Sequence, residues 1–256
     1  MTQDPFIYLL ITLTAAHIAG DFVFQTRSDA ERKHELPVLS KHAGLAAAAA
    51  YVLAGVWSAW IIPLGIFLSH GIVDRLKHAL GKRLNTVRSQ LGLFLGDQFI
   101  HIAVVIFIAV LVADTVSPAR LFWNEQFGNA YSTALILLGG AVLTTKVGGI
   151  CIGMIVQPYL EQIESNQKEG DTGSRGLTDG GKIIGYLERF LIYVFIIAGF
   201  PLGIGFLITA KSVFRFGEVS NPGHRMEAEY IIIGTLMSFA YAVVAGYAVA
   251  AMLGMV

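Results

Sequence analysis

The chain has 256 residues, of which 55% are hydrophobic and only 14% are charged. Its mean hydropathy of +0.64 is well above what a soluble domain of this length needs to fill one core, so we expect the lipid bilayer to be its solvent. The formal net charge is zero, which excludes the basic excess of nucleic-acid-binding proteins, and we expect no nucleic-acid partner. The single cysteine, Cys151, excludes an internal disulfide.

Eight apolar segments follow one another along the chain, several of them near the roughly 20 residues that cross a bilayer as a helix. The start of the chain lacks the positive charge of a signal peptide, so we expect the first segment to be a retained span. The pattern predicts an all-α polytopic transmembrane helix bundle that forms one integral membrane domain over residues 1–256. The segments cover approximately 6–24, 44–60, 61–76, 91–113, 132–156, 183–198, 202–213 and 230–255.

Two pairs of neighbouring segments are joined at uncharged helix breakers, near Pro63 in the first pair and near Pro201 in the second. Proline and glycine end helices at low cost, so each pair predicts a short helical hairpin. The prediction is then about eight membrane segments. If either pair or both form one kinked helix instead, the count is seven or six.

Basic residues are concentrated in the loops after the first and third segments, which places both loops in the cytoplasm by the positive-inside rule. The loop over 114–131 carries only Arg120 and fits the outside. The polar, Gly-rich stretch 158–182 is predicted to be a mobile cytoplasmic loop. The charges favour eight spans with both termini outside. The basic residues are Arg27, Arg32, Lys33 and Lys41 in the first loop, and Arg75, Lys77, Lys82, Arg83 and Arg88 in the second.

Aspartate and histidine recur four residues apart within the apolar segments, a spacing that places both side chains on one helix face. A carboxylate at the bilayer centre costs at least ~2.5 kcal/mol on insertion scales, so it normally faces a partner or a water-filled cavity. The pairs therefore predict a functional site. They are His17 with Asp21, His70 with Asp74, Asp97 with His101, and Asp74 with His78.

Imidazole and carboxylate together are ligands of zinc and other divalent transition ions. We expect one or two such ions, with zinc favoured, because three helices can supply three to six ligands and more than four ligands suit two ions. Two ions about 4 Å apart would activate water for hydrolysis. A proton or cation relay, and simple packing between helices, are the alternative uses of the same pairs. The predicted metal ligands are His17, Asp21, His70, Asp74, Asp97 and His101.

Other polar residues surround the predicted site. Glu188 is a candidate catalytic proton donor or acceptor and Arg189 a candidate anion clamp, although the two can also form an internal ion pair. His42 and His78 are expected to be interfacial, because each follows a lysine. The candidate substrate-binding residues are Gln25, Gln98, Lys146, Lys211 and Arg215.

The runs AHIAGDFVFQ at 16–25, HGIVDRLK at 70–77 and DQFIH at 97–101 resemble a bacterial family of multi-pass membrane proteins catalogued as a domain of unknown function. The runs GYLER at 185–189 and KSVFRF at 211–216 look like the C-terminal half of its longer members. The resemblance implies a multi-pass protein of the bacterial inner membrane, and it implies no activity.

Together these patterns favour a membrane-embedded metal-dependent hydrolase that acts on an anionic lipid or similar substrate at the cytoplasmic leaflet. Its expected partner is membrane lipid, and assembly into a homo-oligomer is left open. The alternative is an ion- or proton-coupled transporter or channel, which needs a water-filled path past Lys146, whereas a hydrolase needs a pocket open on one side only. A third reading is a scaffold that acts through the 158–182 loop.

Overall fold

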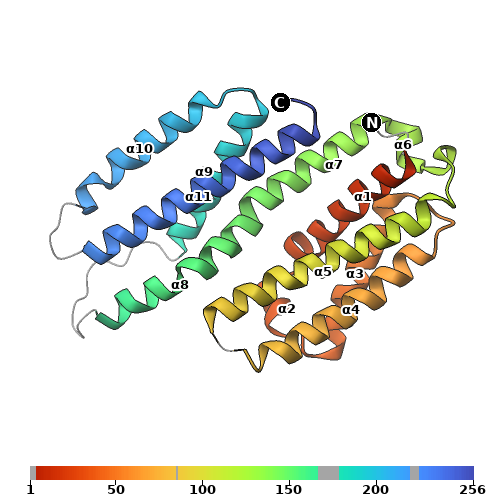
Figure 1. The fold of residues 1–256 in the computed structure, drawn as a ribbon, viewed down its shortest axis with the longest axis horizontal. Helices are drawn as coiled ribbons and strands as arrows, with labels where there is room; N and C mark the ends of the chain where they lie inside the picture. Colours follow the sequence, from red (N-terminus) through yellow and green to blue (C-terminus); the bar gives the residue numbers. More distant parts are fainter. Residues whose placement is uncertain (1–3, 85, 167–178, 220–224) are drawn as a thin grey trace. The chain divides into compact units, whose positions relative to one another are not determined.

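The computed structural model describes residues 4–84, 86–166, 179–219 and 225–256, and these are almost entirely helical, with no strand among them (Figure 1). Five helices are long and apolar enough to cross a membrane. The chain is therefore an all-α, multi-pass membrane protein. The five candidate spans are Pro5–Phe24, Leu36–Ala54, Val87–Ala113, Asn129–Ile163 and Ala228–Met252.

The helices form two compact units, Met1–Val142 and Leu143–Val256. The boundary falls inside the long helix Asn129–Ile163, at the π-helical turn η3 (Leu143–Val147). A π-helical turn interrupts the regular hydrogen-bond ladder of an α-helix, so it is a natural place for the packing to change.

In the first unit, α1 packs against α3, α5 and α7, and α4 packs against α3 and α5 (Figure 1). The packed faces are lined by small and branched apolar residues such as Leu13, Ala50 and Val105. Its elements are α1 (Pro5–Ala19), η1 (Gly20–Phe24), α2 (Arg27–Glu31), α3 (Leu36–Ala54), α4 (Ile61–Gly81), α5 (Val87–Ala113), η2 (Pro118–Arg120), α6 (Phe122–Phe127) and α7 (Asn129–Val142).

Both predicted hairpins consist of two separate helices, so the kinked-helix alternative is wrong. Gly55 ends α3 with a left-handed backbone at φ 61°, and α4 begins six residues later at Ile61. In the second unit, Gly199 adopts φ 69° between α9 (Gly180–Ile197) and α10 (Leu202–Val219). Glycine adopts this conformation without the steric penalty that other residues carry.

Three aromatic side chains hold the C-terminal end of α3. The last carbonyls of a helix lack intrahelical partners. Here the Trp123 indole donates to the carbonyl of Val52 at 2.6 Å, and the Tyr131 hydroxyl donates to that of Leu53 at 2.8 Å. The Tyr8 hydroxyl donates to the next carbonyl, that of residue 54, at 3.0 Å. The orphan carbonyls are thus satisfied at the end of the bundle where α6 lies.

The second unit contains α8 (Gly148–Asn166), α9, α10 and α11 (Arg225–Met252), with α11 packed against the other three. The predicted 158–182 loop is shorter than expected, because α8 continues through Pro158 to Asn166 and α9 begins at Gly180. Proline removes only one helical hydrogen bond, and the neighbouring residues keep the helix intact. Residues 167–178 of that loop lie outside the described residues.

Candidate metal centre

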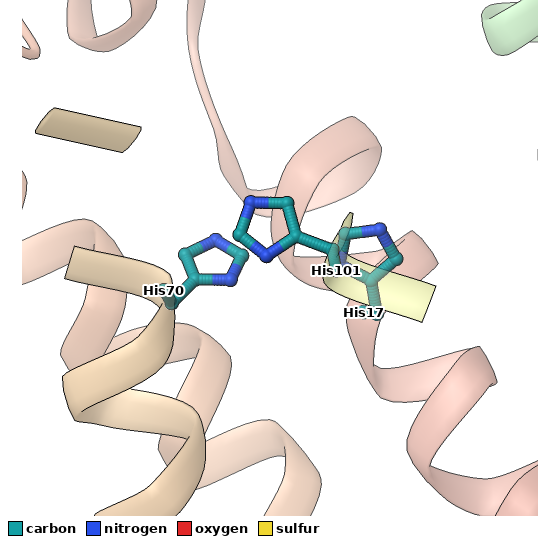
Figure 2. A group of neighbouring side chains, drawn as sticks. All are labelled: His17, His70 and His101. Atoms are coloured by element: carbon teal, nitrogen blue, oxygen red, sulfur yellow. The ribbon is translucent and has the colours of Figure 1, made fainter. Parts of the chain in front are cut away.

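Four helices and one π-helical turn of the first unit bring acidic and imidazole side chains together in an Asp/His cluster. All six residues predicted as metal ligands lie in it, and five of them are at most 7% exposed. Figure 2 shows three of its histidines, with the His101 ring between those of His17 and His70. The cluster consists of His17 (α1), Asp21 (η1), His42 (α3), His70 and Asp74 (α4), and Asp97, Gln98 and His101 (α5).

Asp21 faces two histidines from other helices. Its Oδ1 lies 3.0 Å from Nε2 of His70 and 3.2 Å from Nε2 of His42. The two Nε2 atoms are 2.9 Å apart. One atom from each of three elements therefore forms a triangle whose sides are all about 3 Å.

Hydrogen bonds alone satisfy this triangle poorly. Each Nε2 carries at most one proton, which points at only one of its two close neighbours. At least one contact then joins two lone pairs or two N–H groups, and these repel. A divalent cation accepts lone pairs from all three atoms, and tetrahedral zinc with bonds of about 2.0–2.1 Å separates its ligands by about 3.3 Å. The triangle matches that spacing closely.

Asp74 supplies a fourth donor atom, a carboxylate oxygen, to the same group. Its Oδ2 is 3.5 Å from Nε2 of His42 and 3.9 Å from Nε2 of His70. Both carboxylate oxygens also accept hydrogen bonds from the Lys33 ammonium, at 3.0 and 2.9 Å. A set of two imidazoles and two carboxylates is a suitable donor set for a transition ion.

A second group of donors lies beside the first, on α5. Oδ1 of Asp97 and Nε2 of His101 are 3.4 Å apart, and both atoms are buried without a hydrogen-bond partner among the described residues. Asp21, Asp97 and His101 each offer one ligand atom, and these atoms lie within 4.8 Å of one another. Buried polar atoms without partners are rare, and a bound ion is one explanation for them. Asp21 thus belongs to both groups, as a carboxylate that bridges two ions would.

Gln98 links the two groups by hydrogen bonds. Its amide nitrogen donates to Oδ2 of Asp21 at 3.2 Å and to Oδ2 of Asp97 at 3.1 Å. Its carbonyl oxygen is 3.1 Å from Nε2 of His17. The sequence placed Gln98 at the border of the site as a substrate-binding residue, whereas the structure places it between the carboxylates.

The π-helical turn η1 explains how Asp21 reaches the centre of the cluster. The helix α1 widens at Gly20, so the following residues are rotated relative to a regular helix. A Cβ at Gly20 would lie 3.3 Å from the Cβ of Ala46, so small residues allow α1 and α3 to approach closely at this point. The approach also brings His42 of α3 within reach of Asp21.

The Asp/His pairs act mainly between helices and less within them. Along single helices the separations are 3.9 Å for His70 and Asp74 and 3.4 Å for Asp97 and His101. His70 lies closer to Asp21 of η1, at 3.0 Å. His78 stacks on the ring of His34 at 5.4 Å. The four-residue spacing thus identified the residues but not their partners.

Sequence reasoning missed three members of the site. His42 was expected at the interface, but only 4% of it is exposed. Lys33 and Lys77 were counted only as loop charges, yet each pairs with a cluster carboxylate. One signal was available for His42, which stands three residues after Leu39 and four before Ala46 on the small-residue face of α3.

The short polar helix α2 carries an ion pair of its own. Thr26 caps α2 by accepting a hydrogen bond from the backbone N–H of Asp29 at 3.1 Å. The Thr26 hydroxyl and the Lys41 ammonium lower the pKa of the Asp29 carboxyl below its ordinary value. Asp29 and Lys41 lie 3.2 Å apart in an ion pair outside the cluster, and they therefore serve as matched controls below.

Buried apolar residues lie beside the cluster on the side away from the basic loops. Each of four cluster histidines has a buried apolar residue one helical turn away, and these four apolar residues are at most 7% exposed. A small cavity of about 10 Å³ lies at this level, near the minimum that holds one water molecule. The four residues are Leu13 for His17, Ala46 for His42, Ile66 for His70 and Val105 for His101.

Glu188, Arg189 and Lys211 lie together in the second unit. Oε2 of Glu188 accepts a hydrogen bond from the Lys211 ammonium at 2.6 Å. Arg189 donates to the carbonyl of Thr145 at 3.2 Å and to the Ser238 hydroxyl at 3.0 Å. The alternative of an internal Glu188–Arg189 ion pair is therefore wrong, because each residue has separate partners. Both are buried, at 7% and 4% exposure.

The remaining candidate substrate-binding residues are scattered. Lys146 is exposed and lies in the π-helical turn η3. Gln25 follows η1, and its amide nitrogen is buried without a hydrogen-bond partner among the described residues. Arg215 falls within α10, but its side chain lies outside the described residues.

Comparison with known proteins finds a family match for the part of the chain that contains the cluster. Residues 9–127 match the model of a family described as "Protein of unknown function (DUF3307)". Over these residues the chain is similar to that family. The match includes every member of the Asp/His cluster and ends before the second unit. No curated protein and no solved structure matches the chain.

Proposed function

We propose that the protein is a membrane-embedded hydrolase that depends on divalent transition metal ions and acts on a phosphate-bearing substrate at the cytoplasmic leaflet of the inner membrane of a bacterium. Zinc suits the donor set best, because histidine nitrogens and carboxylate oxygens converge at tetrahedral spacing. One or two ions bound there would lower the pKa of a bound water and stabilise a leaving oxygen.

The triangle of Asp21, His42 and His70 carries the proposal. Its three contacts of 2.9–3.2 Å cannot all be hydrogen bonds, whereas one cation satisfies all of them. Asp74 completes this first ion site. The unpartnered atoms of Asp97 and His101 supply a second, with Asp21 shared between the two.

The one-sided opening of the cluster supports a hydrolase over a transporter. On the basic side, the Lys33 and Lys77 side chains are 16% and 34% exposed and lead from the cluster to the surface. On the other side, an apolar level of four buried residues, Leu13, Ala46, Ile66 and Val105, lies one helical turn beyond the histidines. A transporter needs a polar path that continues beyond this level. A hydrolase needs a single entrance, and the positive-inside rule places this one in the cytoplasm.

The rival function is proton or ion transport, and one observation favours it. Hydrogen bonds form a continuous chain from Lys77 through Asp97 and Gln98 to Asp21 and His70. In a transporter the ionisable members of this network would exchange protons, with Gln98 holding the two carboxylates in place, because its amide nitrogen donates to both. Proton flux into liposomes that contain the purified protein, with a loss of that flux in Asp21→Asn, would support this function instead.

The hydrolase is tested by phosphate release from phosphatidic acid in mixed micelles. We expect release by protein loaded with zinc, none after chelation, and at least a 100-fold lower rate in Asp97→Asn, because that variant loses a proposed ligand. Asp29→Asn is the matched control, since it makes the same chemical change in the loop ion pair with Lys41. Release that is independent of metal, or equal in wild type and Asp97→Asn, would contradict the proposal.

A further inference from the structure

Two lysines neutralise the outer carboxylates of the cluster. The Lys33 ammonium lies 2.9 Å from Oδ2 of Asp74, and the Lys77 ammonium lies 2.7 Å from Oδ2 of Asp97. Both carboxylates are almost completely buried, whereas both lysines reach the surface. Each lysine therefore links a proposed metal ligand to the entrance of the site.

The two ammonium groups supply positive charge to the same carboxylates that a metal ion would bind. Asp74 Oδ2 binds Lys33 while it lies 3.5 Å from Nε2 of His42, so one oxygen faces both the ammonium and the proposed ion position. Asp97 is held by Lys77 through Oδ2, while its Oδ1 faces His101. A divalent ion on either carboxylate would weaken the hold of the lysine by charge repulsion.

The charge balance gives the released lysines a role. Three carboxylates and two ammonium groups, with neutral histidines, leave the cluster with one formal negative charge. One divalent ion changes the net charge to positive, and a second makes it strongly positive. Flexible ammonium groups beside bound metal then attract an anion, and lysine is a common ligand of phosphate oxygens.

We propose that Lys33 and Lys77 are the anion-binding side chains of this centre, which leave Asp74 and Asp97 when metal binds and then hold the phosphate oxygens of the substrate. The inference rests on the proposed function, and it names phosphate as the recognised group and these lysines as its ligands. Metal loading and substrate binding are thereby coupled, because the same two ammonium groups neutralise the carboxylates of the empty cluster and bind the anion once metal is present.

A purely structural role for the lysines predicts the opposite effect on metal affinity. If they only hold the carboxylates in position, their removal disorders the ligands and weakens metal binding. If they compete with the metal, their removal strengthens it. The sign of the change therefore separates the two roles.

Zinc binding is measured by competition with a chromophoric chelator, using the full chain in detergent. We expect Lys33→Met and Lys77→Met each to bind zinc about tenfold more tightly than wild type, since each loses a charged hydrogen bond that competes with the ion. Lys41→Met, which removes the same charge from the loop ion pair with Asp29, should bind zinc like wild type. Lys33→Arg retains the charge and should also resemble wild type.

Phosphate binding is measured on zinc-loaded protein after excess metal is removed. Inorganic phosphate should bind the loaded wild type and Lys41→Met, and should bind Lys33→Met or Lys77→Met about tenfold more weakly. Phosphatidic acid in mixed micelles forms a parallel arm. Binding of the lipid but not of inorganic phosphate identifies the substrate as a lipid headgroup, and binding of both identifies the phosphate group alone as sufficient.

The outcomes separate this inference from the proposed function. If wild type binds no zinc, both fail. If wild type binds zinc but the two methionine variants bind it equally or more weakly, the lysine inference fails and the metal centre stands. If the variants bind zinc more tightly but retain full phosphate affinity, the lysines compete with metal without binding the anion, and the inference is overturned.

Discussion

His42→Ala provides the sharpest test of the geometry, because the sequence alone placed this residue at the membrane interface. In the structure its Nε2 lies 2.9 Å from Nε2 of His70, 3.2 Å from Oδ1 of Asp21 and 3.5 Å from Oδ2 of Asp74. It is therefore one of the four donors that we assign to the first proposed ion site.

The size of the effect follows from this position. Loss of residues that merely orient metal ligands typically reduces affinity 10–100-fold, so loss of a ligand from a set of four should exceed that range. We expect zinc affinity at the first ion site to fall by at least about 100-fold, which corresponds to about 2.8 kcal/mol. Competition with a chromophoric chelator in detergent measures it.

His34→Ala is the matched control, since His34 is exposed and stacks on His78 outside the cluster. His42→Gln separates folding from binding, because it keeps a polar side chain of similar length. Thermal unfolding without metal shows that each variant is folded. If folded His42→Ala binds zinc as tightly as wild type and His34→Ala, the triangle around Asp21 is not a metal site and the reasoning is refuted.

Three further predictions concern stability, measured by unfolding of the purified protein in detergent. Trp123→Phe should lower the free energy of unfolding by about 1 kcal/mol, because it leaves a carbonyl of α3 without its donor; an unchanged value would contradict the capping role. Lys211→Met should cost about 3–5 kcal/mol by leaving the Glu188 carboxylate buried without its partner, and adding Glu188→Gln should restore most of that loss. Gly149→Ala should lower the free energy of unfolding by about 1–3 kcal/mol, because its Cβ would lie 2.5 Å from the Tyr186 ring. Gly153→Ala is the control and should be neutral or slightly stabilising, because a Cβ there has nothing within 4 Å. Equal effects of the two substitutions would refute the packing argument.

The helical architecture follows directly from the sequence. Charge-free stretches of suitable length identify the helices, and helix breakers near Pro63 and Pro201 identify the hairpins, since both signals are local. The first hairpin was misplaced by several residues, because α3 already ends at Gly55 and Pro63 lies inside α4. The π-helical turn at Leu143–Val147 was not predictable, because it has no strong local signature. The extent of α8 was underestimated because Pro158 was taken as a helix end.

The site residues that form regularly spaced Asp/His pairs could be predicted from the sequence, whereas the other site residues could not. Aspartate four residues from histidine is visible along one helix. The six residues predicted as metal ligands lie in one cluster, whereas His78, which has the same spacing from Asp74, stacks on His34 outside it. His42 has no such partner in sequence, and its role depends on how α3 packs against η1 and α4. The pairing of Lys33 with Asp74, 41 residues away, depends on tertiary structure in the same way.

Metal analysis of the detergent-purified chain tests the central claim most directly. Elemental analysis of wild type should find one or two transition ions per chain, and Asp21→Asn should lose most of this metal because the carboxylate is shared by both proposed ion sites. Asp29→Asn, changed in the same way outside the cluster, should retain it. A wild type that holds no stoichiometric metal after purification in its presence, or an Asp21→Asn variant that holds as much as wild type, would contradict the account.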